Sequence, residues 1–317
     1  MFHALKLIAK NHFLYIVCSV IYFFISAKFW SFLVILFYIF IGTSHNGNLK
    51  LSDYFIAFIF YVISLCIALS PLGEKLLRFM NGIRKLETKE EKEYLLPLFN
   101  NVRNSFKKKC RKHDILDNID IFVIDNIHIS ACAVGRRTIA VSKGAMKAFD
   151  EEQLKGVIAH EMAHIYYCDT IASVFLMIAN GLFFIFIFVL NWLIKMIDKE
   201  NDKSMTENQE KKSGRFFQRI FQSILFVFTL LMNITIAIES KKSEYKADDV
   251  AYVIGYGKGI TEALYLLEKI SLGDNRNFIQ KMTASHPRIT ARIEKLESSA
   301  EEQRKKQKQV KPTPTKK

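Results

Sequence analysis

Four long runs of apolar residues divide the chain, at residues 13–41, 54–72, 171–194 and 220–238. Each is about long enough to cross the core of a bilayer as a helix, which takes roughly 20 residues. We expect helices because a backbone in lipid has to satisfy its own hydrogen bonds. The first run is longer than a perpendicular span and has Lys28 at its middle, which predicts one tilted helix whose lysine reaches toward an interface.

The third and fourth runs have two possible arrangements. They either cross the bilayer or form a shallow hairpin that does not fully cross, and both arrangements return the chain to the same side. Basic residues are dense after the second run, in residues 75–112. Because cytosolic loops of membrane proteins are enriched in Lys and Arg, we expect the N-terminus and the middle of the chain in the cytosol.

Residues between the second and third runs have the patterns of a small folded domain. Helical spacing of apolar residues predicts an amphipathic helix over 87–112, in which Pro97 either makes a kink or marks the true start. Alternation of apolar residues predicts a strand at 119–124, and residues 129–134 and 138–142 are two further strand candidates. Residues 135–137 form a plausible hairpin turn between the last two strands.

Helices are expected in most of the remaining chain, at 145–149, after Asp150, and at 239–254, 260–272 and 287–296. Asp150 with Gln153 has the spacing of an N-terminal capping pair. Pro287 suits the first turn of the last helix. Residues 298–317 are rich in Lys, Gln and Pro and nearly lack apolar residues, so we expect disorder there.

The composition indicates which partners the chain binds and whether its cysteines are reduced. The net charge of +14 favours attraction to anionic inner-leaflet lipid. Nucleic acid is excluded as a partner because no nucleic-acid-binding motif accompanies the charge. The five cysteines include no C-x-x-C pair, which indicates reduced thiols.

The strongest chemical signal is the sequence His160-Glu161-Met162-Ala163-His164. Histidines four apart on a helix share one face, so both imidazoles can reach one metal ion. Glu161 between them is placed to act as the general base of a zinc hydrolase. Leu154, Val157 and Ile158 make the helix apolar, and burying ionisable residues there without a metal or partners is costly.

A third zinc ligand is expected well beyond His164, because zinc hydrolases use three protein ligands and an open position. Four acids follow the fourth apolar run: Glu239, Glu244, Asp248 and Asp249. Glu244 and Asp248 share a helix face, which suits one ligand and one carboxylate that orients a ligand histidine. The residues alone do not choose among the four acids.

A resemblance makes that choice. The run Ser243-Glu244-Tyr245-Lys246-Ala247-Asp248 resembles the E-[FY]-x-A-D motif of the HtpX-type membrane zinc metalloproteases, which share a peptidase family with the CAAX prenyl proteases. The order of elements is similar from the first span to about Leu296. His164 and Asp169 have the spacing of the family's H-x-x-x-x-D, although we favour a structural hydrogen bond for Asp169. Ser285-His286-Pro287 with Arg292 resembles its H-P-x-x-x-x-R.

The resemblance implies a role for each matching residue. His160, His164 and Glu244 would hold one Zn²⁺, and Asp248 would orient a ligand histidine. Glu161 would activate water, His286 would stabilise the oxyanion, and Arg292 would position His286. Residues 129–134 would bind an extended substrate, through Ser130, Ala131 and Cys132. Ser130 departs from the family, which usually has Asn at this position.

The prediction is therefore an α+β, mainly helical, membrane-embedded zinc metalloprotease with a small β-sheet and about four hydrophobic membrane segments. The divisions are a transmembrane pair (1–72), two parts of a catalytic domain (73–170 and 241–297), a hydrophobic hairpin (171–240) and a disordered basic tail (298–317). The resemblance implies an integral protein of the bacterial plasma membrane that cleaves membrane or misfolded polypeptides on the cytosolic face for protein quality control. The alternatives are a protease-like membrane sensor and a non-catalytic zinc-binding scaffold or chaperone; a prenyl-protein protease ranks low.

Overall fold

A computed structural model describes residues 51–109, 113–174, 237–270 and 286–310, together with single positions within 13–20 and 223–234. The chain divides into two compact units. One contains residues 1–73 and 171–236, and the other contains residues 74–170 and 237–317. Most of the first, third and fourth predicted apolar runs lies outside the described residues.

In the first unit, helix α4 (Leu51–Ala68) covers most of the second apolar run. The run is not one continuous helix, because the next helix, α5 (Pro71–Met80), starts before the run ends. Pro71 suits a first helical position, since its fixed φ matches the helix and its missing N–H needs no partner there. Ser70 Oγ also accepts a hydrogen bond from Gly73 N at 3.3 Å, as an N-cap does.

Among the residues that the structure describes, no helix is both long enough and apolar enough to cross a membrane.

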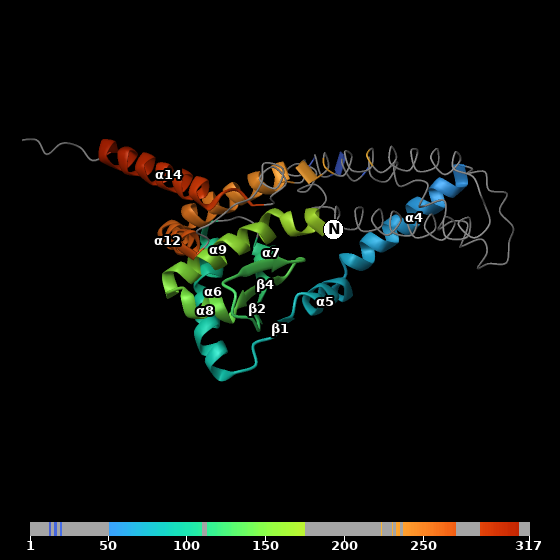
Figure 1. Ribbon diagram of the computed structural model, residues 1–317, viewed down its shortest axis with the longest axis horizontal. Coiled ribbons are helices and arrows are strands. Elements are labelled where there is room, and N and C mark those ends of the chain that lie inside the picture. The colour runs from blue at the N-terminus through green and yellow to red at the C-terminus, as the bar shows by residue number, and fades with distance from the viewer. Residues whose placement is uncertain are drawn as a thin grey trace, which may run out of the picture. The chain divides into compact units, whose positions relative to one another are not determined.

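The second unit is built on a four-stranded mixed sheet of order β1-β2-β4-β3 (Figure 1). The strands are β1 (Ile83–Arg84), β2 (Asp120–Ile124), β3 (Ala131–Val134) and β4 (Thr138–Ser142). β2 and β4 are parallel, and the other two pairings are antiparallel. The three predicted strands are confirmed, and so is the hairpin turn, in which Gly135 has φ +61°. β1 was missed because two residues show no alternation.

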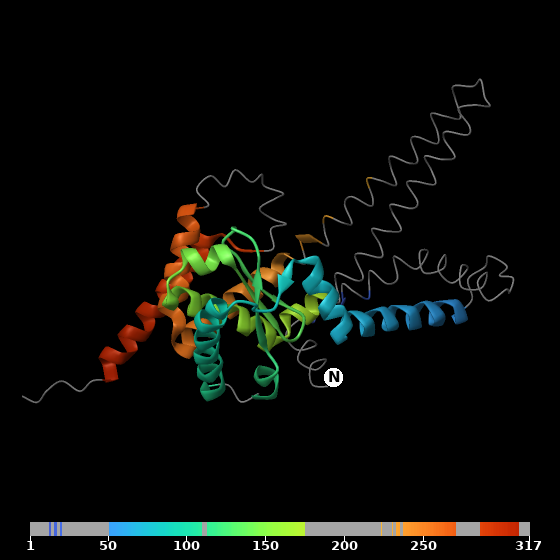
Figure 2. The ribbon, with the colours of Figure 1, turned by 90° about the horizontal axis from the view of Figure 1, so that it is seen from below.

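The other helices of this unit form a core with one face of the sheet, some packed on the strands and others on neighbouring helices. They are α6 (Lys89–Lys109), α7 (His113–Asp117), α8 (Lys143–Ala148), α9 (Glu151–Tyr167), α12 (Gly257–Ile270) and α14 (Ile289–Val310), with a π-helical turn η1 (Tyr252–Tyr256) and helical residues 237–251. Val123 and Val141 of the sheet pack in one core with residues of α6, α9 and α12. Figures 1 and 2 show α9 running along the sheet.

Helix boundaries differ from the predictions at both ends of this unit. α6 starts at Lys89 because Thr88 and Glu91 form reciprocal hydrogen bonds of the capping-box kind, and Pro97 lies inside the helix. α14 continues to Val310, so the prediction of disorder from residue 298 is wrong as far as that residue. Glu301 and Glu302 each precede a lysine by four residues, a spacing that stabilises helices.

Two glycines let α9 and α12 approach closely. A Cβ on Gly156 would lie 2.3 Å from Ile260 N, and a Cβ on Gly259 would lie 2.0 Å from Glu152 O. Both neighbours are backbone atoms, which cannot move aside as a side chain can. This crossing fixes the helix that contains His160, one turn after Gly156.

Replacing Gly156 by Ala is therefore expected to lower stability by at least about 1–3 kcal/mol, the usual cost of overpacking. Thermal unfolding of the detergent-solubilised chain measures this change. Glu93→Ala, at an exposed position of α6, is the control and should leave the midpoint nearly unchanged. Equal midpoints for the two variants would contradict a close crossing of α9 and α12.

Candidate metal centre

Helix α9 brings two histidines to one face. The helix begins with the predicted capping box, in which Asp150 accepts from Gln153 N at 2.8 Å and Asp150 N donates to Gln153 Oε1 at 3.2 Å. His160 is buried and His164 is half-buried. Their Nε2 atoms lie 3.2 Å apart, so both point at the same small volume.

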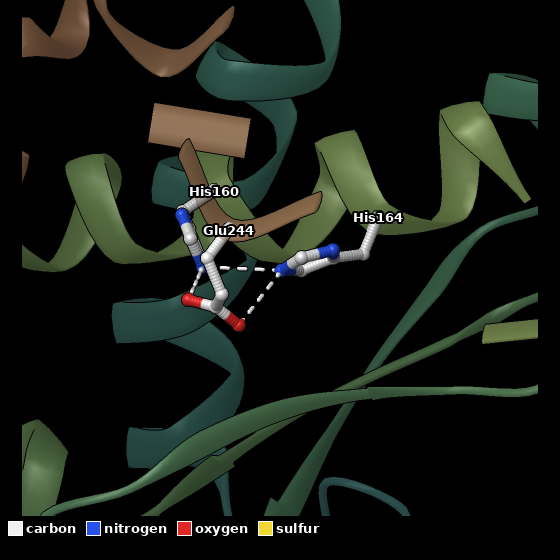
Figure 3. A group of neighbouring side chains, drawn as sticks. All are labelled: His160, His164 and Glu244. Atoms are coloured by element: carbon white, nitrogen blue, oxygen red, sulfur yellow. Dashed lines mark hydrogen bonds and ion pairs between the residues drawn. The ribbon is translucent and has the colours of Figure 1, made fainter. Parts of the chain in front are cut away.

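The third side chain at this volume is Glu244, from the helical residues 237–251 (Figure 3). Its Oε2 lies 3.4 Å from His160 Nε2, and its Oε1 lies 3.6 Å from His164 Nε2. All three donor atoms lie within 4.8 Å of one another. Of the four acids that the pattern left open, the structure brings Glu244 to the Nε2 atoms of both histidines.

The donor spacing fits one zinc ion. Ligands at the usual bond lengths of a tetrahedral zinc are about 3.3–3.4 Å apart, close to the three separations seen here. Two imidazoles and one carboxylate are also a donor set of catalytic zinc sites, which leave a position open. Glu244 Oε2 is buried and makes no hydrogen bond, although Arg292 Nη1 lies 3.0 Å from it as an ion pair, so this oxygen can still accept a metal ion.

A carboxylate holds the far nitrogen of each histidine. His160 Nδ1 lies 2.9 Å from Asp248 Oδ1, and His164 Nδ1 lies 2.8 Å from Asp169 Oδ2. Ser243 Oγ donates in turn to Asp169. Such bonds fix the tautomer and the ring orientation and leave Nε2 free to bind a metal. Asp169 therefore makes the structural hydrogen bond that we favoured, and its partner is a ligand histidine.

Arg292 and His286 complete the charged cluster. Arg292 is buried and donates to both oxygens of Asp248, from Nη2 at 2.7 Å and from Nε at 2.8 Å. Its Nη1 lies 3.0 Å from Glu244 Oε2. His286 is exposed, and its Nδ1 lies 2.8 Å from Glu244 Oε1. The contacts of Arg292 thus lead to the two carboxylates rather than to His286, the partner predicted from sequence.

The neighbouring charges in this cluster shift the pKa values of His160 and Glu244. Burial opposes a charged His160, but its hydrogen bonds to Asp248 and Glu244 outweigh burial and raise its pKa to about 10. Burial also opposes the charged carboxylate of Glu244, yet His160 and His286 lower its pKa. Because zinc binds neutral imidazole, it competes with the proton on His160, and zinc affinity rises with pH.

The other predicted site residues lie on and beside β3. Cys132 is in the strand, half-buried, and burial raises the pKa of its thiol to about 12, so it stays protonated. Ser130, just before the strand, is exposed. Glu161 is half-buried on α9, the helix that packs against β3. Ser243 was missed as a site residue, because its role depends on contact with Asp169 across the fold.

Removing the carboxylate behind His164 should weaken zinc binding. For Asp169→Ala we expect a loss of about 10–100-fold in zinc affinity, the usual effect of deleting such a partner. Titration against a competing chelator measures it. Asp249→Ala is the control, because Asp249 pairs with Lys295 at 2.7 Å. Unchanged affinity in Asp169→Ala would show that the ring needs no such support.

Comparison with known families agrees with this geometry. The model of peptidase family M48 matches residues 99–300, well over half of the chain. This chain belongs to peptidase family M48. The prediction of a metallopeptidase with one zinc site is confirmed at the level of the family, and it rests on the match together with the intact cluster of two histidines and a glutamate.

Individual relatives are distant. The chain is 25% identical over 225 residues to a Protease HtpX homolog of Chlorobium phaeovibrioides, covering 66% of this chain and 73% of that protein. It is 26% identical over 171 residues to a Protease HtpX homolog of Bordetella pertussis, covering 50% and 56%. The crystal structure of S. mikatae Ste24p has a similar fold, with a TM-score of 0.50 and 17% identity over 92% of this chain and 66% of that one.

Proposed function

We propose that this M48 member is a membrane-bound zinc endopeptidase that cleaves extended segments of other polypeptides. The observation that carries the proposal is the juxtaposition of three zinc donors, an adjacent glutamate and an open sheet edge. His160, His164 and Glu244 form the donor set, and α9, which contains Glu161, packs against edge strand β3.

Zinc, when bound, lowers the pKa of a water molecule and polarises a carbonyl. Glu161 takes the proton from the attacking water and passes it to the leaving amine. His286 donates a hydrogen bond to the developing oxyanion, since its position against Glu244 places it at the donor cluster. Arg292 positions the site by bridging Glu244 and Asp248, which orients the ligand Glu244 and the partner of His160.

Strand β3 offers backbone groups for a substrate. Ser130 O accepts from Ser142 N at 2.9 Å, and Ser130 N donates to Ser142 Oγ at 3.0 Å, so the backbone of Ser130 faces β4. Hydrogen-bonding direction alternates along an antiparallel strand, so Ala131 and Ala133 turn their N–H and C=O groups to the open edge. An extended peptide can add there as a further strand.

This geometry refines the predicted substrate-binding residues. We propose that the backbones of Ala131 and Ala133 pair with the substrate, and that the backbone of Cys132 pairs with Ala140 of β4. The exposed side chain of Ser130 is then left as a polar contact at the start of the strand, where the resembling family usually has Asn.

Proline substitutions can distinguish the N–H groups of β3 that face the open edge from those that face β4. Ala133→Pro removes an N–H that faces outward, so the fold should persist while kcat/KM for a peptide falls at least about 2–10-fold, the equivalent of one hydrogen bond. Cys132→Pro removes an N–H that faces β4 and should destabilise the sheet. Wild-type kcat/KM in a folded Ala133→Pro variant would argue against strand addition at this edge.

The substrate class and the location rest on the relatives. Proteins named Protease HtpX homolog resemble this chain. The first 72 residues of this chain contain two long apolar runs. We propose an integral protein of a bacterial plasma membrane with its site on the cytosolic face. Its substrates would be exposed segments of membrane proteins, including misfolded ones, which makes it a quality-control protease.

The first test is zinc-dependent cleavage of casein by the full chain, purified in detergent, stripped with a chelator and then supplied with zinc. Cleavage that disappears with the metal and returns with it supports the peptidase. Stoichiometric zinc binding without cleavage of casein or of the chain itself would favour a zinc-binding scaffold, the main alternative. Cleavage restricted to one endogenous protein would instead favour a sensor.

A further inference from the structure

Helix α5 exposes its apolar face and packs its polar face on the protein, which is the reverse of an ordinary surface helix. Leu72, Leu76, Phe79 and Met80 are exposed to 69%, 57%, 82% and 72%. Their spacing puts them on one face of α5. The opposite face contains Glu74, which is buried, and Arg78, which is half-buried. The polar face therefore packs on the protein, and the apolar face points away from it.

The polar face is attached to the β3–β4 turn. Glu74 Oε1 accepts from Thr138 Oγ1 at 2.7 Å and from Arg137 N at 3.2 Å. Arg78 Nη1 donates to Thr138 Oγ1 at 3.1 Å, and its guanidinium lies 4.8 Å from the centre of the Phe122 ring. A buried carboxylate with several donors is a costly arrangement to break. These bonds hold the polar face of α5 on the β3–β4 turn and leave its apolar face outward.

The turn is shaped for this attachment. Gly135 has φ +61°, and a Cβ there would lie 2.9 Å from the side-chain carbons of Glu74. A side chain at position 135 would thus push Glu74 away. On the other side of the turn, Thr170 Oγ1 donates to Gly135 O at 2.5 Å. The turn is consequently joined both to α5 and to the segment that follows the metal-binding helix α9.

Exposed basic side chains lie on α5 and on the turn that its polar face contacts. Lys75 is exposed on α5, and Arg136 and Arg137 are exposed at the turn that α5 contacts. A helix with a broad apolar face and basic neighbours is typical of segments that lie in the plane of a membrane surface, with the apolar face about 5–10 Å into the headgroup and acyl boundary. Basic residues at that depth are attracted to anionic lipid.

We propose that α5 lies in the surface of an anionic bilayer, with Leu76, Phe79 and Met80 among the lipids and Arg136 and Arg137 at the phosphates. Since the turn after β3 is attached to α5, this places one end of the substrate-binding edge at the membrane surface. Polypeptide leaving the bilayer would then meet β3 directly. The placement of α5 can be measured without any cleavage, so it stands or falls separately from the peptidase activity.

A tryptophan introduced by Phe79→Trp reports the depth of this face. The chain has two tryptophans, Trp30 and Trp192, which are replaced by Phe in the background. The full chain with Phe79→Trp is reconstituted in vesicles of equimolar phosphatidylcholine and phosphatidylglycerol, with lipids brominated near the glycerol or near the chain ends. Ile127→Trp is the matched control, since Ile127 is also apolar and exposed but lies in the β2–β3 loop.

We expect blue-shifted emission from the Phe79→Trp variant, with loss of most of its intensity in vesicles brominated near the glycerol and less in those brominated near the chain ends. The Ile127→Trp variant should emit as in water and keep its intensity. Adding Arg136→Gln and Arg137→Gln to Phe79→Trp should reduce the quenching. Water-like, unquenched emission from the Phe79→Trp variant overturns the proposal. Blue-shifted but unquenched emission also overturns it, since protein rather than lipid would then cover the face.

Discussion

Glu161→Gln is expected to retain one zinc per chain and to lose proteolysis, with kcat falling by about 100- to 10,000-fold, the usual contribution of a general base. The amide of Gln has nearly the shape of the carboxylate but cannot take a proton from water. Glu161 lies on α9 between the two ligand histidines and is half-buried, so the substitution leaves the donor cluster and the core intact.

The measurement compares casein cleavage by the two proteins at saturating zinc, with zinc content determined on the same samples. Glu151→Gln is the matched control, because it makes the same change at an exposed position of the same helix. It should cleave at the wild-type rate. Undiminished cleavage by Glu161→Gln would remove this residue as the base.

Glu244→Ala is expected to abolish stoichiometric zinc binding, with a loss of affinity greater than the roughly 10–100-fold that follows removal of an orienting partner. The substitution deletes one of three donor side chains. It also removes the acid that pairs with His286 and Arg292. Activity should disappear together with the metal.

Two further variants make this result specific. Glu239→Ala removes a buried acid of the same helix that pairs with Lys242 at 3.0 Å, and it should keep zinc. Glu244→Gln preserves the side-chain volume, so zinc loss in that variant cannot come from a cavity. Retention of one tightly bound zinc by both Glu244 variants would assign the third ligand to another acid.

Local sequence patterns were sufficient to predict the metal-binding helix. The spacing of His160 and His164 and the cap at Asp150 and Gln153 are properties of a single helix, and the structure has both. The strands of the sheet were likewise predicted from local sequence, apart from β1. The extent of α14 was not recognised because helix-forming charged residues and a disordered tail have similar compositions.

The two carboxylate partners of the histidines differ in how far the sequence alone could reveal them. Asp169 is five residues from His164, so its contact with that ring is nearly local. Asp248 reaches His160 from a separate helix, and Arg292 reaches Asp248 from a third one. Spacing could suggest these residues, but it could not say which atoms meet. The contacts of Arg292 are with the two carboxylates, and its role in positioning His286 stays a prediction.

The sequence by itself determined the helix with its two histidines and the glutamate between them, and its resemblance to a known family selected Glu244 from four acids as the third ligand. Tertiary structure shows how Glu244 reaches the histidines: the packed helix face turns it to their Nε2 atoms, while Asp249 pairs with Lys295. It also decided which groups of β3 face the open edge and which face of α5 points outward. The physical reason is the same in each case: a local pattern sets which residues share a face, and only packing against other elements sets where that face points.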